Sequence, residues 1–210
     1  MSRRPTKPAR EARRRDWRAA DLVALDFETT GLDPRSDDVI SFGLVPVSGG
    51  RIDLSGARYQ EVAPRVAPRH SSIRVHHLRT QDLATAPPMA QVVDSFREGL
   101  ADRFILAWAA GVEIAFLRRI FGGFNRTWRS RTIDVRTLIK ALERDAAARG
   151  SDEPARYALG SAAQRFGVPV EQTHHALDDA FMTAELFLIA ATRLAGSDRG
   201  TIGDLRAVGR

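Results

Sequence analysis

Runs of apolar residues in the first third of the chain predict three β-strands. Residues 22–28 are apolar for most of their length, and such a run is typical of a central strand that is buried on both faces. Residues 39–47 predict the second strand, and the Ser-Gly-Gly sequence that follows is typical of a hairpin turn. A third strand is expected around residues 57–62, and residues 64–77 are expected to form a loop.

Helical spacing of apolar residues begins after two consecutive prolines at positions 87 and 88 and then alternates with short apolar runs. The expected elements are a helix over residues 92–100, a strand over 104–108, a helix over 116–124, a short strand at 133, a helix from 135 to about 150, a short helix over 159–166 and a long helix over 177–194. Three early strands followed by alternating helices and strands indicate an α/β fold, with a mixed sheet flanked by helices.

The composition fits one globular domain. The chain has 210 residues, of which 43% are hydrophobic, so it can bury a sizeable core. It has no Cys, which excludes disulfides and leaves carboxylate, His or backbone oxygen as ligands for any metal. No apolar run approaches a membrane span, and the basic start lacks the apolar stretch of a cleaved secretory signal. We therefore expect a cytoplasmic protein without a membrane partner.

The net charge of +6 lies in the first 20 residues, which carry eight Lys or Arg and two acidic residues. We therefore divide the chain into a basic flexible arm over residues 1–20, a folded domain over residues 21–195 and a loose C-terminal tail over residues 196–210. Clustered cations attract nucleic acid, although a solvated leader is an equally good interpretation of the arm alone. All but two of the 32 basic residues are Arg, which suggests a GC-rich bacterial genome.

Two carboxylates, Asp26 and Glu28, end the first predicted strand. Residues two apart on a strand project from the same face, with Cα atoms roughly 6.6 Å apart. Leu22 and Ala24 share that face, and carboxylates beside apolar residues are costly unless something pairs them. Ligands of α/β sheets collect at this end of the strands, and a divalent cation is a natural partner. For this pattern alone, however, a solvent-facing pair bonded to turn amides is the better interpretation.

The last predicted helix begins with a second acidic group. Asp179 lies in line with Met182 and Leu186 on the apolar stripe, so it should point at the sheet, whereas Asp178 should face water. His174 lies about one turn away from Asp179 and gains interest from that neighbour. Acidic residues are also common at helix starts because they stabilise the helix dipole, an interpretation that suits Asp178 better than Asp179.

Glu113 is a further candidate near the start of the helix that carries Phe116 and Leu117. It lies on their face of the helix and could therefore point inward. Its spacing fits a helix-start acid equally well.

Two of these segments resemble motifs of the DEDDh family of 3′–5′ exonucleases, which includes the proofreading epsilon subunit of bacterial DNA polymerase III. Asp26-Phe27-Glu28-Thr29-Thr30-Gly31-Leu32 resembles the first motif in full. His174-His175-Ala176-Leu177-Asp178-Asp179-Ala180 resembles the third, with its His and Asp five residues apart. Residues 75–87 and 132–134 resemble the connecting segments, so the resemblance runs from about residue 22 to residue 194.

The middle motif departs from the family pattern. The family has His-Asn-x-x-Phe-Asp, whereas this chain has Trp108-Ala109-Ala110-Gly111-Val112-Glu113. Glu113 therefore stands in place of the family's Asp, with a side chain one methylene longer. Asp134 is the nearest substitute ligand if Glu113 points away, although a helix N-cap before Val135 is the favoured interpretation of Asp134.

The resemblance implies a ribonuclease H-like fold and a two-metal phosphodiester hydrolase. Asp26, Glu28, Glu113 and Asp179 would hold two divalent cations, Mg²⁺ with Mn²⁺ able to substitute. His174 would be the general base that takes a proton from the attacking water. Backbone at Thr29 and Leu32 would hold the terminal nucleotide, with His76 near its phosphate.

The implied substrate is the 3′ end of a nucleic acid, expected to be single-stranded, with DNA favoured and a DNA polymerase as a candidate partner. Two alternatives stay open. RNA-trimming exonucleases share these motifs, and the contacts to the 2′-hydroxyl that would separate RNA from DNA cannot be read from the sequence. A degenerate, non-catalytic domain that binds nucleic acid or a polymerase would explain the altered middle motif but not the intact first and third motifs.

Overall fold

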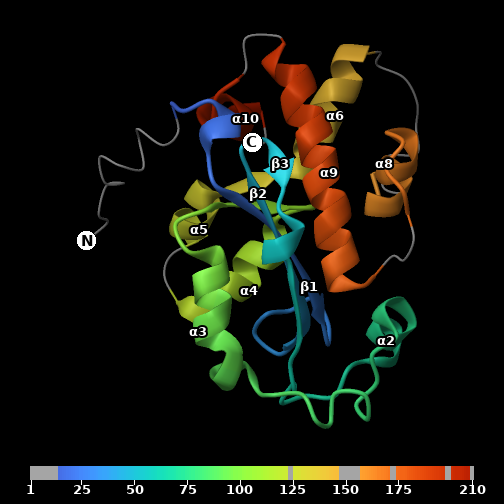
Figure 1. Ribbon diagram of the computed structural model, residues 1–210. Coiled ribbons are helices and arrows are strands. Elements are labelled where there is room, and N and C mark those ends of the chain that lie inside the picture. Colours follow the sequence, from blue (N-terminus) through green and yellow to red (C-terminus); the bar gives the residue numbers. More distant parts are fainter. Residues whose placement is uncertain (1–13, 123–124, 147–156, 171–173, 197–199, 209–210) are drawn as a thin grey trace.

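A mixed sheet of six strands forms the centre of the computed structural model (Figure 1). The structure describes residues 14–122, 125–146, 157–170, 174–196 and 200–208. Its main order is β3-β2-β1-β5-β6, and β4 also pairs with β2. Strand β1 is antiparallel to β2 and parallel to β5, and β5 is parallel to β6. The strands are β1 (Leu22–Thr29), β2 (Val39–Ser48), β3 (Arg51–Ile52), β4 (Arg58–Glu61), β5 (Phe104–Ala107) and β6 (Thr132–Asp134).

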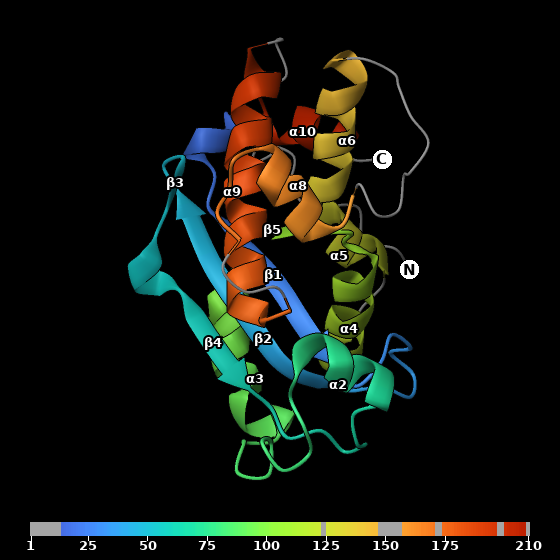
Figure 2. The ribbon, with the colours of Figure 1, turned by 90° about the vertical axis from the view of Figure 1, so that its right-hand side faces the viewer.

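Helices cover both faces of the sheet, as Figures 1 and 2 show. Alternate residues of β1 divide between two hydrophobic clusters because successive side chains of a strand point to opposite faces. Leu22 and Ala24 pack on the side of α6, α8, α9 and α10, and Leu25 packs on the side of α3 and α4. The helices are α2 (His70–His76), α3 (Met89–Leu100), α4 (Gly111–Phe121), α5 (Asn125–Arg131), α6 (Val135–Ala146), α8 (Leu159–Arg165), α9 (Ala176–Ala195) and α10 (Ile202–Val208).

Gly43 of β2 lets the start of α9 lie directly on the sheet. A Cβ atom on Gly43 would lie 2.2 Å from the carbonyl oxygen of Ala176 and 2.6 Å from the Cα atom of Leu177. Only a residue without a side chain permits this approach. Gly43 is also the antiparallel partner of Asp26 in β1. The close approach therefore brings the acidic first turn of α9 next to the carboxylates of β1.

The folded region extends further toward both ends of the chain than the sequence predicts. Trp17 lies in the short 3₁₀ helix η1 (Trp17–Ala19), is 2% exposed, and packs edge-on against Phe187 of α9. The backbone N–H of Trp17 donates a hydrogen bond to the carbonyl of Gly200, and Ile202 and Leu205 of α10 are buried in the same cluster. The prediction of a loose tail after residue 195 is therefore wrong for residues 200–208, and the arm does not extend as far as residue 20. Residues 1–13 lie outside the described part.

The other differences concern short elements. Residues 70–76, expected to be part of a loop, form α2, which has no side-chain N-cap bond and buries only His76. The two-residue β3 and the helix α5 were not predicted. The helix predicted from residue 135 was expected to end near residue 150, which lies outside the described residues; α6 is described as far as Ala146.

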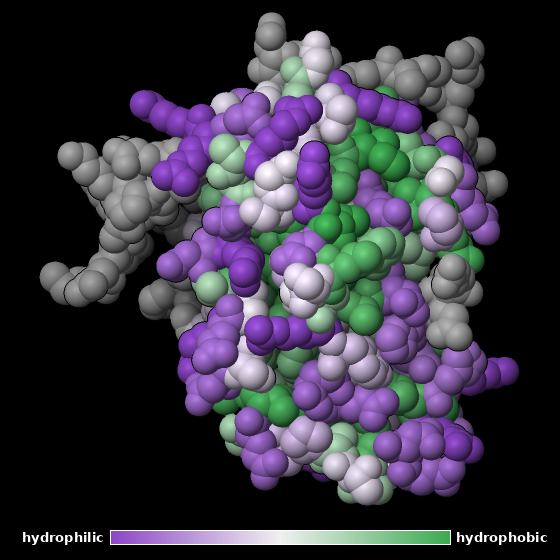
Figure 3. Space-filling view, viewed as in Figure 1, coloured by the Kyte–Doolittle hydropathy of each residue, from purple (hydrophilic) through white to green (hydrophobic). Residues whose placement is uncertain are grey.

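The surface carries few large apolar side chains. Leu32, Leu54, Val66 and Val75 are the exposed large hydrophobic residues of the described part. Figure 3 shows hydrophilic residues over much of one face, with hydrophobic residues at the surface along the line of α9. Among the described residues, no helix has the length and hydropathy needed to cross a membrane.

Candidate active site

Asp26 and Glu28 lie at the carboxyl end of β1, on the face that α9 covers. Both continue the alternation that places Leu22 and Ala24 toward α9. Glu28 is buried, and Asp26 is partly exposed. The strand therefore presents two carboxylates to one end of the sheet, as the sequence predicts.

Asp179 and His174 come to the same place from the start of α9. Asp179 is buried, and its Oδ2 atom accepts a hydrogen bond of 3.2 Å from the backbone N–H of His174. Its other oxygen, Oδ1, has no hydrogen-bond partner. The potential ligand atoms of Glu28, His174 and Asp179 all lie within 4.8 Å of one another, so these residues form one cluster.

Glu113 lies near Asp26 and belongs to α4. Its side chain is 4% exposed, and its Oε2 atom is buried without a hydrogen-bond partner. Its charge is close enough to Asp26 to raise the pKa of that carboxyl. Glu113 lies in the first turn of α4, as a helix-start acid would, but its side chain is buried and does not face solvent.

Asp134 has a different place, at the end of β6. Its Oδ1 atom accepts a hydrogen bond of 3.0 Å from the N–H of Thr137, so it caps α6, as expected. Its Oδ2 atom accepts a hydrogen bond of 3.1 Å from the N–H of Ala110, just before α4. Both carboxylate oxygens are therefore engaged with backbone.

Burial and the charge of neighbouring carboxylates raise the pKa of Asp26, Glu28, Glu113 and Asp179. The pKa of Asp26 is raised by its burial and then by Asp179, Glu113 and Glu28. Burial followed by the charge of Asp179 raises the pKa of Glu28 to about 8. Burial likewise raises the pKa of Glu113 to about 8 and that of Asp179 to about 6. Each shift has the sign expected when a charged form is desolvated beside other anions.

This donor set fits a divalent cation. None of the salt bridges found among the described residues involves Asp26, Glu28, Glu113 or Asp179. Buried carboxylates that lack a cationic partner are costly, and hard divalent cations prefer oxygen ligands. Two buried carboxylate oxygens, one on Glu113 and one on Asp179, have no hydrogen-bond partner and are available for coordination. The residues present therefore suit a metal held by carboxylates, with His174 beside it.

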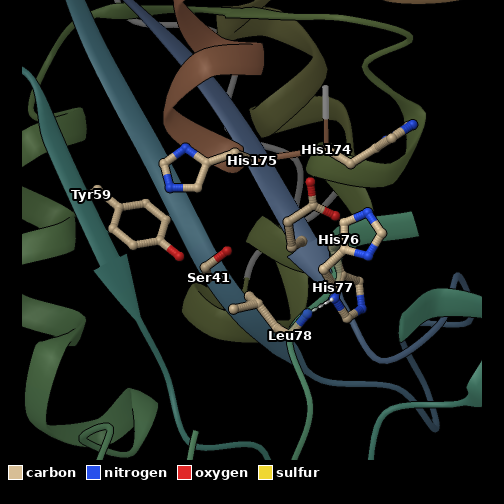
Figure 4. A pocket seen from close by; sticks show the side chains of 8 residues that line it. Ser41, Tyr59, His76, His77, Leu78, His174 and His175 are labelled. Carbon is tan, nitrogen blue, oxygen red and sulfur yellow. Dashed lines mark hydrogen bonds between the residues drawn. The ribbon is translucent and has the colours of Figure 1, made fainter. Parts of the chain in front are cut away.

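A pocket of about 420 Å³ opens next to Glu28 and His174. Figure 4 shows His76, His77 and His174 on one side of it, and Tyr59 with His175 on the other. The rings of Tyr59 and His175 stack with centroids 4.4 Å apart, and Nδ1 of His175 lies 3.1 Å from Oδ2 of Asp178. The remaining lining residues are Ser41 and Leu78.

The residues expected to bind substrate lie around the same end of the sheet. Thr29 is buried at the end of β1, while Leu32 in the next loop is 75% exposed. His76 is buried at the end of α2, where Nδ1 accepts a hydrogen bond of 3.0 Å from the N–H of Leu78. The Nε2 atom of His76 makes no hydrogen bond of good geometry. Burial lowers the pKa of His76, and the nearby carbonyl of Thr29 offsets part of that fall.

A buried carboxylate fixes the loop that carries Leu32. Asp37 accepts hydrogen bonds from the hydroxyl of Thr30 and, at 2.9 Å, from the N–H of Asp33. It also lies 3.1 Å from the guanidinium of Arg69, just before α2. A Cβ atom on Gly31 would lie 2.5 Å from Oδ2 of Asp37, so glycine is required for this closure. The network joins the loop after β1 to the helix that ends in His76.

Sequence reasoning missed Asp37 and Arg69, and it also missed the Tyr59–His175 wall of the pocket. No local pattern identifies Asp37, because its carboxylate binds Arg69, which lies 32 residues away in the sequence. Tyr59 reaches the site because β4 pairs with β2 in a register that places Tyr59 opposite Gly43. His77 belongs to a segment that the family resemblance includes, but nothing in the sequence distinguishes it from its neighbours.

A family model described as exonuclease matches residues 23–187. The chain belongs to the exonuclease family. Its clustered carboxylates make it an exonuclease domain of the DEDD type, as the sequence motifs predict. The DNA polymerase III PolC-type protein of Thermotoga maritima is 31% identical over 170 residues, which cover 80% of this chain and 12% of that protein. The exonuclease domain thus spans about an eighth of the length of this relative.

Solved exonuclease structures share the fold of the domain. Exonuclease I of E. coli in complex with a dT13 oligonucleotide superposes with a TM-score of 0.73 at 14% identity, over 85% of this chain and 42% of that one. Exonuclease X in complex with 5′-overhanging duplex DNA superposes with a TM-score of 0.62 at 18% identity, over 88% and 99%. The expected ribonuclease H-like fold, a mixed sheet flanked by helices, is confirmed.

Proposed function

We propose that this exonuclease domain removes nucleotides one at a time from the 3′ end of single-stranded DNA in a reaction that depends on divalent metal ions. The observation that carries the proposal is the convergence of Asp26, Glu28, Glu113 and Asp179 beside His174 at one end of the sheet. Three separate elements, β1, α4 and α9, deliver these carboxylates. A structural role would not require four acidic groups, three of them buried, at one end of the sheet.

The four carboxylates would hold two Mg²⁺ ions, with Mn²⁺ as a substitute. Such ions, when bound, neutralise charge on the reacting phosphate and make a bound water more acidic. Asp26 repels three other carboxylates, which is consistent with a central position among the ligands. Glu113 supplies the ligand of the middle motif. One of its carboxylate oxygens is buried and has no hydrogen-bond partner, whereas both carboxylate oxygens of Asp134 accept hydrogen bonds from backbone.

His174 would take the proton from the attacking water. Partial burial and the neighbouring His77 lower the pKa of His174, which favours the neutral imidazole that can accept a proton. The hydrogen bond between its backbone N–H and Asp179 fixes its place relative to the carboxylates. The side chain remains exposed, so water and substrate can reach it.

The terminal nucleotide would lie along the loop after β1. Backbone at Thr29 and Leu32 would hold it, and His76 would face its phosphate. The exposed side chain of Leu32 suits contact with a base, since apolar side chains pack against the faces of unstacked bases. We favour DNA because the superposed exonuclease I and exonuclease X structures contain DNA.

The wider context of the domain is also part of the proposal. A DNA polymerase is a candidate partner because the relative in Thermotoga maritima is named as a polymerase III chain. A cytoplasmic location stays a prediction from the sequence.

A substrate panel tests the proposal. Matched DNA and RNA oligonucleotides carry a label at the 5′ end and either a free hydroxyl or a phosphate at the 3′ end. We expect a ladder that shortens from the 3′ end of DNA with a free hydroxyl, and slower degradation of RNA. Activity that begins at the 5′ end, or internal cleavage of a circular single strand, would contradict the proposed polarity. Faster degradation of RNA would replace the proposed substrate with RNA.

A further inference from the structure

Two histidines on the wall of the pocket have a left-handed backbone. Four non-glycine residues of the described part have positive φ, and they include His77 at 61° and His174 at 66°. The other two are Ala101 and Ala109. Residues with a Cβ atom are strained in this conformation, and such strain often marks a functional place. His174 is already assigned as the general base, whereas His77 has no role in the proposed reaction so far.

His77 occupies a position that favours glycine. It is the C-cap of α2, where its N–H donates a hydrogen bond of 2.8 Å to the carbonyl of Ile73. Glycine is the usual residue at a left-handed helix C-terminus because it has no Cβ atom. The imidazole of His77 is exposed and takes part in none of the hydrogen bonds or salt bridges found among the described residues. Packing therefore does not explain why a large side chain stands here.

The side chain of His77 lies between two residues of the proposed reaction. It lines the pocket together with His76 and His174 (Figure 4). Its charge is near enough to lower the pKa of both neighbours. Nδ1 of His76 accepts a hydrogen bond, so Nε2 carries the ring hydrogen and can donate. The pocket wall thus presents adjacent imidazole donors, and none of the described residues that line it is Lys or Arg.

We propose that His77 is an additional substrate-binding residue, whose imidazole N–H donates a hydrogen bond to a non-bridging phosphate oxygen of the DNA strand near its 3′ end. The inference rests on the proposed function and extends it. A phosphate is the expected partner because its oxygens accept hydrogen bonds from imidazole, and a strand that reaches Glu28 and His174 carries phosphates past this wall. His77 has a left-handed backbone at this position and lines that wall.

Replacement of His77 by glycine separates binding from strain. His77→Gly should unfold about 2–4 °C higher than the parent, because glycine relieves the left-handed strain. The same variant should have a KM for oligothymidylate about tenfold higher, with kcat little changed, because one charge-assisted hydrogen bond is lost. Ala101→Gly is the matched control: Ala101 is the positive-φ C-cap of α3, and its variant should gain stability without a change in KM.

Two further measurements identify the contact. His77→Asn, which tolerates the left-handed backbone and keeps a donor, should recover part of the lost affinity. Oligothymidylates in which single linkages are neutral methylphosphonates should bind the parent more weakly at one position near the 3′ end, and His77→Gly should be insensitive to that position. Affinities measured with Ca²⁺ in place of Mg²⁺ make this comparison independent of turnover, so an inactive parent would overturn the proposed function and leave the contact testable. An unchanged affinity in His77→Gly, or equal methylphosphonate effects in both proteins, would overturn the inference.

Discussion

The carboxylate of Asp134 accepts a hydrogen bond of 3.1 Å from the backbone N–H of Ala110 and so joins the end of β6 to the start of α4. Ala110 precedes the first turn of α4, from which Glu113 points at the other carboxylates. Because its second oxygen caps α6 through Thr137, Asp134 supports the site without entering it. The position of Glu113 therefore depends on a residue whose two carboxylate oxygens both accept hydrogen bonds from backbone.

A comparison of Asp134→Asn with Glu113→Gln separates these two roles. Asp134→Asn keeps an oxygen for the cap but loses one hydrogen bond, so it should cost about 1 kcal/mol of stability and only a modest part of kcat. Glu113→Gln should lower kcat by about a hundredfold or more, because a ligand loses its charge. The check is kcat of both variants in saturating Mn²⁺. Loss of activity in Asp134→Asn with a rate near the parent's in Glu113→Gln would exchange the roles of the two residues.

The stability of the metal-free protein should fall as pH rises. Burial and repulsion raise the pKa of Glu28 and Glu113 to about 8, so the folded state binds more protons than the unfolded state at intermediate pH. The stability that these groups contribute is fully present below their unfolded pKa of about 4.3 and is lost as pH rises through about 8. Urea unfolding in EDTA should show a loss of about 2 kcal/mol or more between pH 6 and pH 8.5.

Two comparisons isolate the cause of that pH dependence. Glu113→Gln should flatten it, because one of the titrating carboxyls is removed, and saturating Mg²⁺ should also flatten it in the parent. If the slope in EDTA were the same with and without Glu113, this carboxyl would not be buried among the others.

The sequence predicts much of the site because its motifs obey local geometry. Asp26 and Glu28 share a face through the two-residue period of a strand, and Asp179 is placed by its helical alignment with Met182 and Leu186. The prediction that Asp134 is an N-cap is confirmed for the same reason, since a cap involves neighbouring residues.

The parts that escape prediction depend on contacts between distant segments. Helix α2 is seven residues long and buries only His76, so it has no apolar stripe to identify it. Helix α10 is buried because Ile202 and Leu205 meet a cluster built from most of the chain, including Trp17. The approach of α9 to β2 depends on Gly43, and a glycine within a strand does not reveal which segment lies against it.

The basic arm should increase affinity for nucleic acid without affecting the chemical step. Because Trp17 is part of the fold, the deletion that tests this must spare it, and residues 1–13 still carry five Lys or Arg and one Glu. Removal of residues 1–13 should raise KM for long single strands, flatten its dependence on salt and leave kcat little changed. The measurement is KM over a series of NaCl concentrations. An identical salt slope in the shortened protein would show that the arm does not contact the substrate.

The central claim is that the converging carboxylates form a metal-dependent nuclease site, and Asp26→Asn tests it most directly. The measurement is the initial rate at which nucleoside 5′-monophosphate is released from a single-stranded DNA oligonucleotide, for the parent and for Asp26→Asn, in Mg²⁺ and in EDTA. We expect release by the parent in Mg²⁺ and none in EDTA. Asp26→Asn should be slower by about a thousandfold, with a stability equal to or above that of the parent because carboxylate repulsion is relieved. Release by the parent in EDTA, or by Asp26→Asn at the parent's rate, would contradict the claim.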